Sequence, residues 1–68
     1  MPQKRLTDGE LWACAEEYVR RLGYEAPIMA GMRADELLDK ADFEGAANWT
    51  LIVKRINELL ARPAGAAN

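Results

Sequence analysis

The chain has 68 residues, half of them hydrophobic, with a formal net charge of −2 at pH 7 and no histidine. This length allows one domain at most, near the lower limit for independent folding, and the hydrophobic half argues for a packed core. The acidic balance argues against a nucleic-acid binder, and the missing histidine excludes His-based catalytic triads and most zinc sites.

The sequence also bears on the cellular compartment. Its single cysteine, Cys14, has no second cysteine with which to form an internal disulfide. No apolar run is long enough for a membrane span, and no signal peptide follows Met1. These features predict a cytoplasmic protein without a membrane segment.

Helical periodicity predicts an all-α fold, a small three-helix bundle, because no segment shows the alternation of a strand. A single domain is expected over residues 6–62. The helices are expected at about 8–22, 27–41 and 43–61, with a flexible lead at 1–5 and a flexible tail at 63–68.

The sequence marks both ends of the first helix. Thr7 and Glu10 have the spacing of a capping box, in which each side chain accepts a hydrogen bond from the other residue's backbone N–H. Gly23 stands at the expected end, and Tyr24 is expected to pack back on Val19. The stripe expected to face the core comprises Leu11, Trp12, Ala15, Tyr18, Val19 and Leu22, with Cys14 at its edge.

The second helix carries apolar residues on two sides. Pro27 suits its first helical position, where the missing N–H needs no partner. Ile28, Met29 and Met32 lie on one side, and a helix that is apolar on two sides is either central or leaves one side for a partner. The other side, expected to pack inward, comprises Ala30, Ala34, Leu37, Leu38 and Ala41.

The third helix is expected to begin after Asp42, which caps it. The small residues Gly45, Ala46 and Ala47 stand just before Trp49, and we interpret them as a packing notch for a neighbouring helix rather than a ligand pocket. The expected core stripe comprises Gly45, Ala46, Trp49, Ile52, Val53, Ile56, Leu59 and Leu60. The residues expected to face solvent are Glu44, Leu51, Lys54, Arg55 and Glu58.

Three features have a chemical and a structural interpretation. Cys14 has no histidine to activate it and is interpreted as a core thiol. The acidic group Asp35, Glu36, Asp39 and Asp42 matches neither an EF-hand nor a di-iron pattern and is interpreted as solvated surface. Lys54, Arg55 and Arg62 allow a recognition helix in a helix-turn-helix, but Glu44 and Glu58 interrupt that basic face.

The chain contains the motifs "ELWACA" (10–15) and "AP" (26–27) and the series Asp42, Gly45, Trp49, Ile52, Arg55 and Ile56. In these residues it resembles a family of short bacterial proteins that form a domain of unknown function. The resemblance covers about residues 9–60. It implies a small cytoplasmic protein and supplies no catalytic residue. The chain departs from that pattern at Ala30, where an apolar residue is frequent, and at Ala41, where glycine is frequent.

The sequence therefore predicts a non-enzymatic protein-interaction module or a homo-oligomer, with a homodimer as one form. The expected interface residues are Ile28, Met29, Met32 and Leu51. No catalytic, metal-binding or cofactor-binding residue is predicted, and no small-molecule substrate is implied. The alternative is a small helix-turn-helix-like DNA-binding or transcription-associated protein that uses the third helix.

Overall fold

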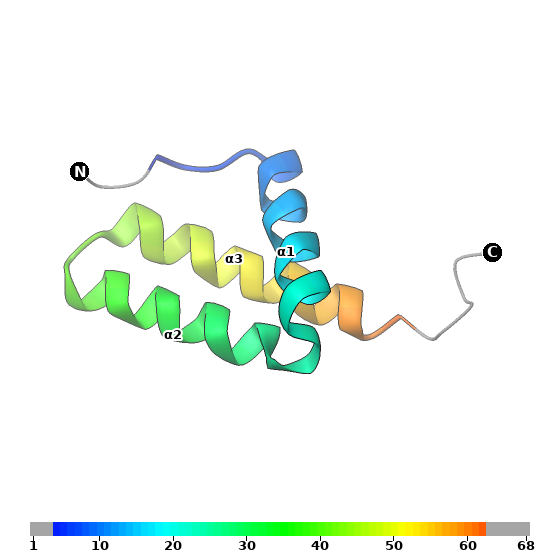
Figure 1. Ribbon diagram of the computed structural model, residues 1–68. Coiled ribbons are helices and arrows are strands. Elements are labelled where there is room, and N and C mark those ends of the chain that lie inside the picture. The colour runs from blue at the N-terminus through cyan, green and yellow to red at the C-terminus, as the bar shows by residue number, and fades with distance from the viewer. Residues whose placement is uncertain (1–3, 63–68) are drawn as a thin grey trace.

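The computed structural model describes residues 4–62, so the predicted tail and most of the predicted lead lie outside the described residues. Three α-helices follow in order, α1 (Asp8–Leu22), α2 (Ala26–Asp39) and α3 (Phe43–Leu60), with a short 3₁₀ turn, η1 (Gly23–Glu25), between α1 and α2 (Figure 1). The described part contains no strand, which confirms the predicted all-α class.

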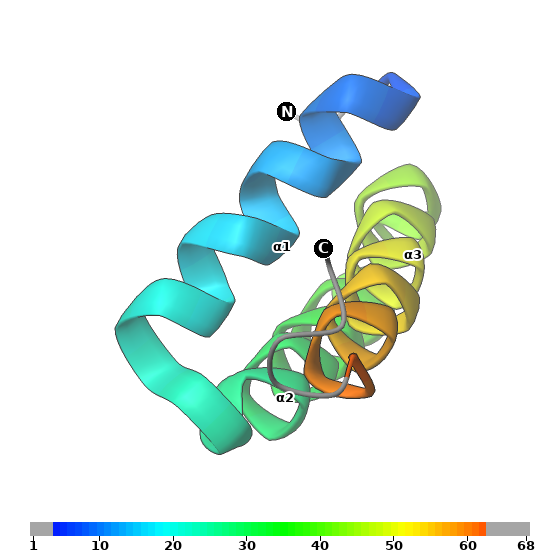
Figure 2. The ribbon, with the colours of Figure 1, turned by 90° about the vertical axis from the view of Figure 1, so that its right-hand side faces the viewer.

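The helices are arranged as a hairpin with a third helix across it. Only three residues connect α2 to α3, so the two helices run antiparallel and side by side (Figure 1). Seen along the hairpin, α1 lies against one side of the pair and crosses it (Figure 2). The three helices therefore do not lie parallel to one another, and α1 leaves part of α2 uncovered.

The predicted ends of α1 are largely correct. The Glu10 N–H donates to Thr7 Oγ1 at 3.2 Å and the Thr7 N–H donates to Glu10 Oε1 at 2.8 Å, which completes the capping box. Gly23 ends the helix with a φ of +58°. The prediction for Tyr24 is wrong: its side chain is 83% exposed, because the chain continues from Gly23 into the 3₁₀ turn instead of folding back on Val19.

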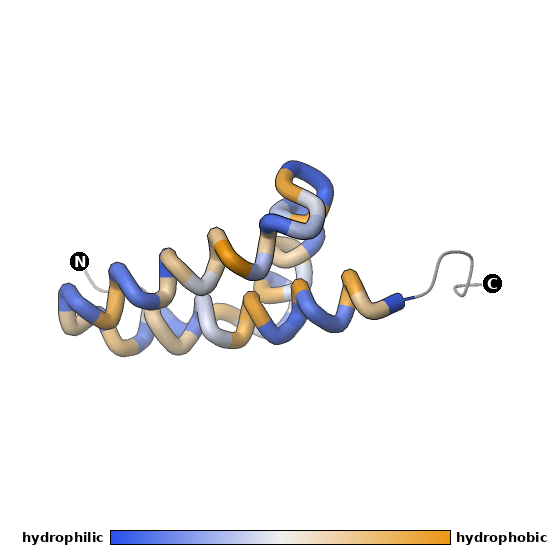
Figure 3. The backbone as a smooth tube through the Cα atoms, turned by 90° about the horizontal axis from the view of Figure 1, so that it is seen from below, coloured by the Kyte–Doolittle hydropathy of each residue, from blue (hydrophilic) through white to orange (hydrophobic). Residues whose placement is uncertain are grey.

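The core combines buried residues of all three helices, and hydrophobic positions are interleaved with hydrophilic ones along each helix (Figure 3). On α2 the buried face is mainly alanine, at positions 26, 30 and 34, together with Leu37. Leu38 was predicted to pack inward but is 54% exposed, since it lies about 100° further round the helix than Leu37. The main core cluster comprises Leu11, Ala15, Ala26, Ala30, Ile52 and Ile56.

Two predictions for solvent-facing residues of α3 are also wrong. Leu51 is half-buried and packs against the core. Arg55 is half-buried as well, with its guanidinium 5.0 Å from the centre of the Trp12 ring. Trp12 and Asp8 of α1 lie against Arg55, so the crossing α1 covers α3 beyond its apolar stripe, which explains the difference at Arg55.

The prediction for Ala41 is wrong. It was expected to be helical and inward-facing, but α2 ends before it and its side chain is exposed. The Asp42 N–H donates to the Leu37 carbonyl at 2.8 Å and the Ala41 N–H donates to the Leu38 carbonyl at 2.9 Å. These two bonds define a Schellman motif, whose turning residue has a left-handed conformation and is usually glycine. Here it is alanine, with a φ of +61°.

The substitution Ala41→Gly is therefore expected to raise the free energy of unfolding by about 1 kcal/mol. Glycine adopts a positive φ without the steric cost that Cβ imposes. Urea denaturation followed by circular dichroism measures the change. The matched control is Ala13→Gly in the exposed middle of α1, which is expected to lower the same quantity by about 1 kcal/mol. A loss of stability in both variants would contradict the assigned turn.

The small residues at the start of α3 differ in role: Ala46 is buried, as expected for the predicted packing notch, whereas Gly45 makes room for a cap. Asp42 caps α3, and its Oδ1 accepts a hydrogen bond from the Gly45 N–H at 3.0 Å. A Cβ at Gly45 would lie only 2.5 Å from Asp42 Oδ2. Gly45 thus makes room for the cap, whereas Ala46 is a buried packing residue.

Asn48 is a buried polar residue that the sequence analysis did not single out. Its Oδ1 accepts a hydrogen bond from the Leu6 N–H at 3.0 Å, and its Nδ2 donates to the Lys4 carbonyl at 2.6 Å. The amide therefore fastens the segment before α1 to α3.

Candidate functional site

The first half of α2 presents large apolar side chains to solvent. Ile28 is 66% exposed, Met29 43% and Met32 55%. Tyr24 precedes them in η1, and its spacing to Ile28 and Met32 is the four-residue interval of one helix face. We call Tyr24, Ile28, Met29 and Met32 the apolar patch.

The position of the patch follows from the packing of α2. The alanines at positions 26, 30 and 34 face the core because small side chains let α2 lie close to α3. At 3.6 residues per turn, Ile28 and Met32 then fall on the opposite side of the helix. Burying the alanine face therefore leaves Ile28 and Met32 exposed at the surface.

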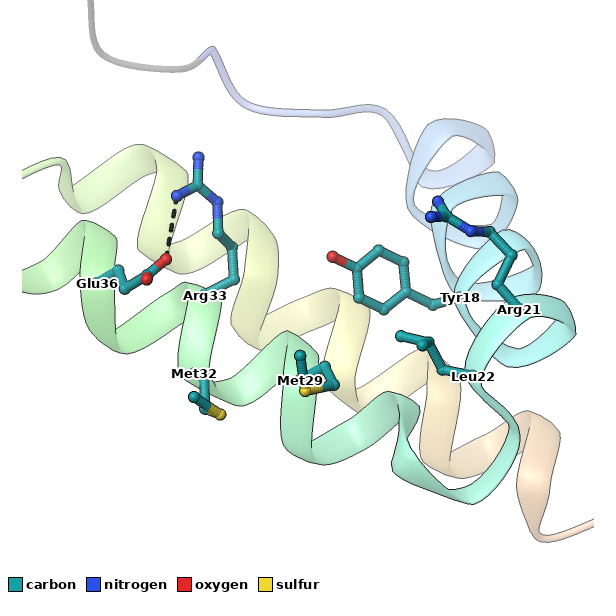
Figure 4. Close-up of a pocket in the computed structure, with 7 residues that line it drawn as sticks. All are labelled: Tyr18, Arg21, Leu22, Met29, Met32, Arg33 and Glu36. Carbon is teal, nitrogen blue, oxygen red and sulfur yellow. Dashed lines mark hydrogen bonds and ion pairs between the residues drawn. The ribbon is translucent and has the colours of Figure 1, made fainter.

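A groove borders the patch where α1 crosses α2 (Figure 4). Its volume is about 330 Å³. Tyr18 stands in its wall, and its ring contacts Trp49 edge to face with the ring centres 5.1 Å apart. The residues that line the groove are Tyr18, Arg21 and Leu22 of α1 and Met29, Met32, Arg33 and Glu36 of α2.

The polar residues of the groove lie at its edges. Arg33 Nη1 donates to Glu36 Oε1 at 3.2 Å, and this pair is drawn at one end of the groove (Figure 4). Arg21 lies on the α1 side and forms no ion pair with the described residues. The groove is thus an apolar depression with one unpaired guanidinium beside it, and such a shape suits a bulky apolar side chain.

Of the four interface residues predicted from sequence, the structure brings three together. Ile28, Met29 and Met32 share the first half of α2, whereas Leu51 packs against the core from α3 and does not belong to the patch. Sequence analysis missed Tyr24, although its four-residue spacing to Ile28 is visible in the chain. It also missed the groove, which depends on how α1 crosses α2.

The other sequence candidates lie outside the apolar patch. Cys14 is half-buried and packs against the core. Asp35, Glu36 and Asp39 are exposed, and Asp42 is the cap of α3. Among residues 4–62, no group of histidine, cysteine, aspartate and glutamate side chains is arranged to hold a metal ion.

The basic residues of α3 do not form one open surface. Arg55 Nη2 contacts Asp8 Oδ1 at 3.1 Å, and Arg55 Nη1 contacts Glu58 Oε2 at 3.3 Å. Lys54 is exposed, but the neighbouring Arg55 is already engaged within the molecule. The intramolecular pairs lower the charge available to a phosphate backbone.

No helix in the described part of the chain combines the length and the apolar character that crossing a membrane requires. Comparisons with protein-family models, with curated proteins and with solved structures give no match to this chain.

Proposed function

We propose that the chain is a non-enzymatic protein-interaction module of the cytoplasm, a small three-helix unit that associates with another protein or with itself through the apolar patch. The exposure of Tyr24, Ile28, Met29 and Met32 carries the proposal. Taking about 200 Å² for each fully exposed side chain of this size, the four expose roughly 500 Å². The largest apolar patch on a single chain is often functional, and a patch of this size is therefore a candidate binding surface.

Two further features of the patch support this function. Methionine is unbranched and polarizable, so Met29 and Met32 adapt to partners of different shape. Tyr24 adds an aromatic ring with a polar end, a type of side chain that is enriched at the centres of interfaces. The adjoining groove offers a depression into which a partner's side chain fits.

The helix-turn-helix alternative has no comparable support. It requires a basic face on α3, and Arg55 is held by Asp8, Glu58 and the Trp12 ring. The net charge of −2 also opposes association with DNA. We therefore place the interaction on α2 and not on α3.

The double substitution Met29→Lys/Met32→Lys tests the proposal. It is expected to weaken association by roughly tenfold or more, because it places two charges where apolar surface is buried. Helicity is expected to stay near the wild-type value, since both positions are exposed and lysine is a good helix former. Sedimentation velocity and quantitative partner capture measure the association, and circular dichroism measures the helicity.

The matched control is Leu38→Lys/Phe43→Lys, which introduces the same charges at two similarly exposed apolar residues outside the patch. It is expected to associate like the wild type. If the patch variant sediments and captures partner like the wild type, the apolar patch is not the interaction surface.

A further inference from the structure

The outward side of α2 combines its apolar side chains with a border of carboxylates. Four- and seven-residue intervals place Glu25, Asp35 and Asp39 on the same side of the helix as Ile28 and Met32. All five side chains are exposed. We call Glu25, Asp35 and Asp39 the acidic border of the patch.

The acidic border is not neutralised within the described part of the molecule. None of its three carboxylates takes part in an ion pair there, whereas Glu36 is paired with Arg33. Helical spacing also places Arg33 away from Ile28, on the groove side of α2. The outward side of α2 is therefore apolar along its first half and negatively charged along its second half, with Glu25 at its start.

This charge distribution disfavours a second copy of the chain as the occupant. Pairing two copies through the outward sides of α2 about a two-fold axis brings the two acidic borders near each other. Like charges brought together in an interface cost free energy and suppress that partner. A partner with positive charges next to apolar side chains meets no such cost.

The size of the surface fits a single helix. A stable interface buries about 800 Å² on each partner. The apolar patch supplies more than half of this area by the estimate above, and the border and the groove add the rest. A helix laid along a groove or face with anchors every three to four residues is a common way in which short segments bind.

We propose, building on the function proposed above, that the apolar patch and its acidic border bind an amphipathic helix whose apolar row is flanked by lysine or arginine. The apolar row lies on Ile28 and Met32, and one bulky side chain enters the groove beside Met29. Asp35 and Asp39 continue the row of Ile28 and Met32 into the second half of α2, so the cationic residues of the partner lie beyond its apolar row, over these two carboxylates.

A peptide pair tests this assignment on the full chain. One synthetic helix carries a leucine row flanked by lysines, and the second carries the same row flanked by glutamates. By fluorescence anisotropy at low salt, the lysine peptide is expected to bind roughly tenfold more tightly, and its affinity is expected to fall as salt increases. Equal affinities for the two peptides would overturn the charge assignment.

Charge reversals locate the binding surface. Asp35→Lys is expected to weaken binding of the lysine peptide by roughly fivefold. Glu16→Lys makes the same change at an exposed and unpaired carboxylate of α1 and is expected to alter it less than about twofold. Equal weakening by the two variants shows a non-specific attraction to an acidic protein and overturns the inference.

Two results separate this inference from the function on which it rests. In the first result, the wild-type chain forms a dimer that dissociates in Met29→Lys/Met32→Lys but is not weakened by Asp35→Lys. The occupant of the patch is then a second copy, which overturns the inference and leaves the interaction function in place. In the second result, the Met29→Lys/Met32→Lys variant associates as strongly as the wild type. This result overturns both the inference and the proposed function.

Discussion

Ile56→Ala is expected to lower the free energy of unfolding by about 3 kcal/mol. Ile56 is fully buried in the cluster where all three helices meet, with Leu11 and Ala15 of α1 and Ala26 and Ala30 of α2. Its truncation removes buried apolar contacts and leaves a cavity that the surrounding helices fill only in part. For a chain of this size the total stability is about 3–10 kcal/mol, so this one change takes away a large share of it.

The matched control is Ile28→Ala on α2, where the same side chain is 66% exposed. Its effect on stability is expected to stay within about 0.5 kcal/mol, because little packing is lost and alanine favours the helix. Urea denaturation followed by circular dichroism compares the two. Should Ile56→Ala fail to fold, Ile56→Val, with an expected loss of about 1 kcal/mol, keeps the comparison measurable. Equal losses at positions 28 and 56 would mean that the core is misplaced.

Asn48→Ala is expected to lower the free energy of unfolding by about 2 kcal/mol. The amide of Asn48 is completely buried and forms two hydrogen bonds to the backbone of the preceding segment, one with the Leu6 N–H and one with the Lys4 carbonyl. The substitution leaves both backbone groups without this partner and opens a small cavity. Hydrogen exchange is expected to show that the Leu6 amide loses its protection.

Asn57→Ala is the matched control, because Asn57 is an exposed asparagine on the same helix. Its expected change is within about 0.5 kcal/mol. Asn48→Asp separates the two hydrogen bonds: the carboxylate still accepts from Leu6 but offers no donor to Lys4, and it buries a charge. It is expected to be at least as destabilising as Asn48→Ala. If Asn48→Ala matched Asn57→Ala in stability and in Leu6 exchange, the fastening role of Asn48 would be wrong.

The helix boundaries were largely predictable from sequence because their signals are local. Each of these signals acts within one helical turn. Thr7 with Glu10 and Asp42 lie where they were expected, and Pro27 is the second residue of α2 instead of the first. Ala41 shows the limit of such signals. An alanine is a good helix former, but the bonds of the Schellman motif hold it in a left-handed turn.

The errors concern residues whose environment depends on how the helices cross. Leu51 and Arg55 lie at the edge of the α3 stripe, and Arg55 is covered because Trp12 and Asp8 of α1 lie against it. Asn48 had a usable signal, since its spacing to Gly45, Ile52 and Ile56 places it in the buried stripe. Its polar side chain obscured that pattern, and its hydrogen-bond partners lie more than 40 residues away.

The candidate site was predictable in part for the same reason. Periodicity alone separates Ile28, Met29 and Met32 from the alanine face of α2. The groove and the unpaired state of the acidic border require the positions of side chains from two helices. Sequence thus indicates a spare apolar surface, and the structure adds the shape and charge on which the proposed partner is based.

Site-specific photo-crosslinking tests the central claim most directly. A photoreactive amino acid is placed either at Ile28, within the apolar patch, or at Lys54, an exposed residue of α3. Each chain is then irradiated in a lysate of its source cells, with and without nuclease. The account predicts discrete protein crosslinks from position 28 that persist after nuclease treatment, and none above background from position 54. Crosslinks from position 54 alone, or crosslinks lost on nuclease treatment, would contradict the assignment of the interaction to α2.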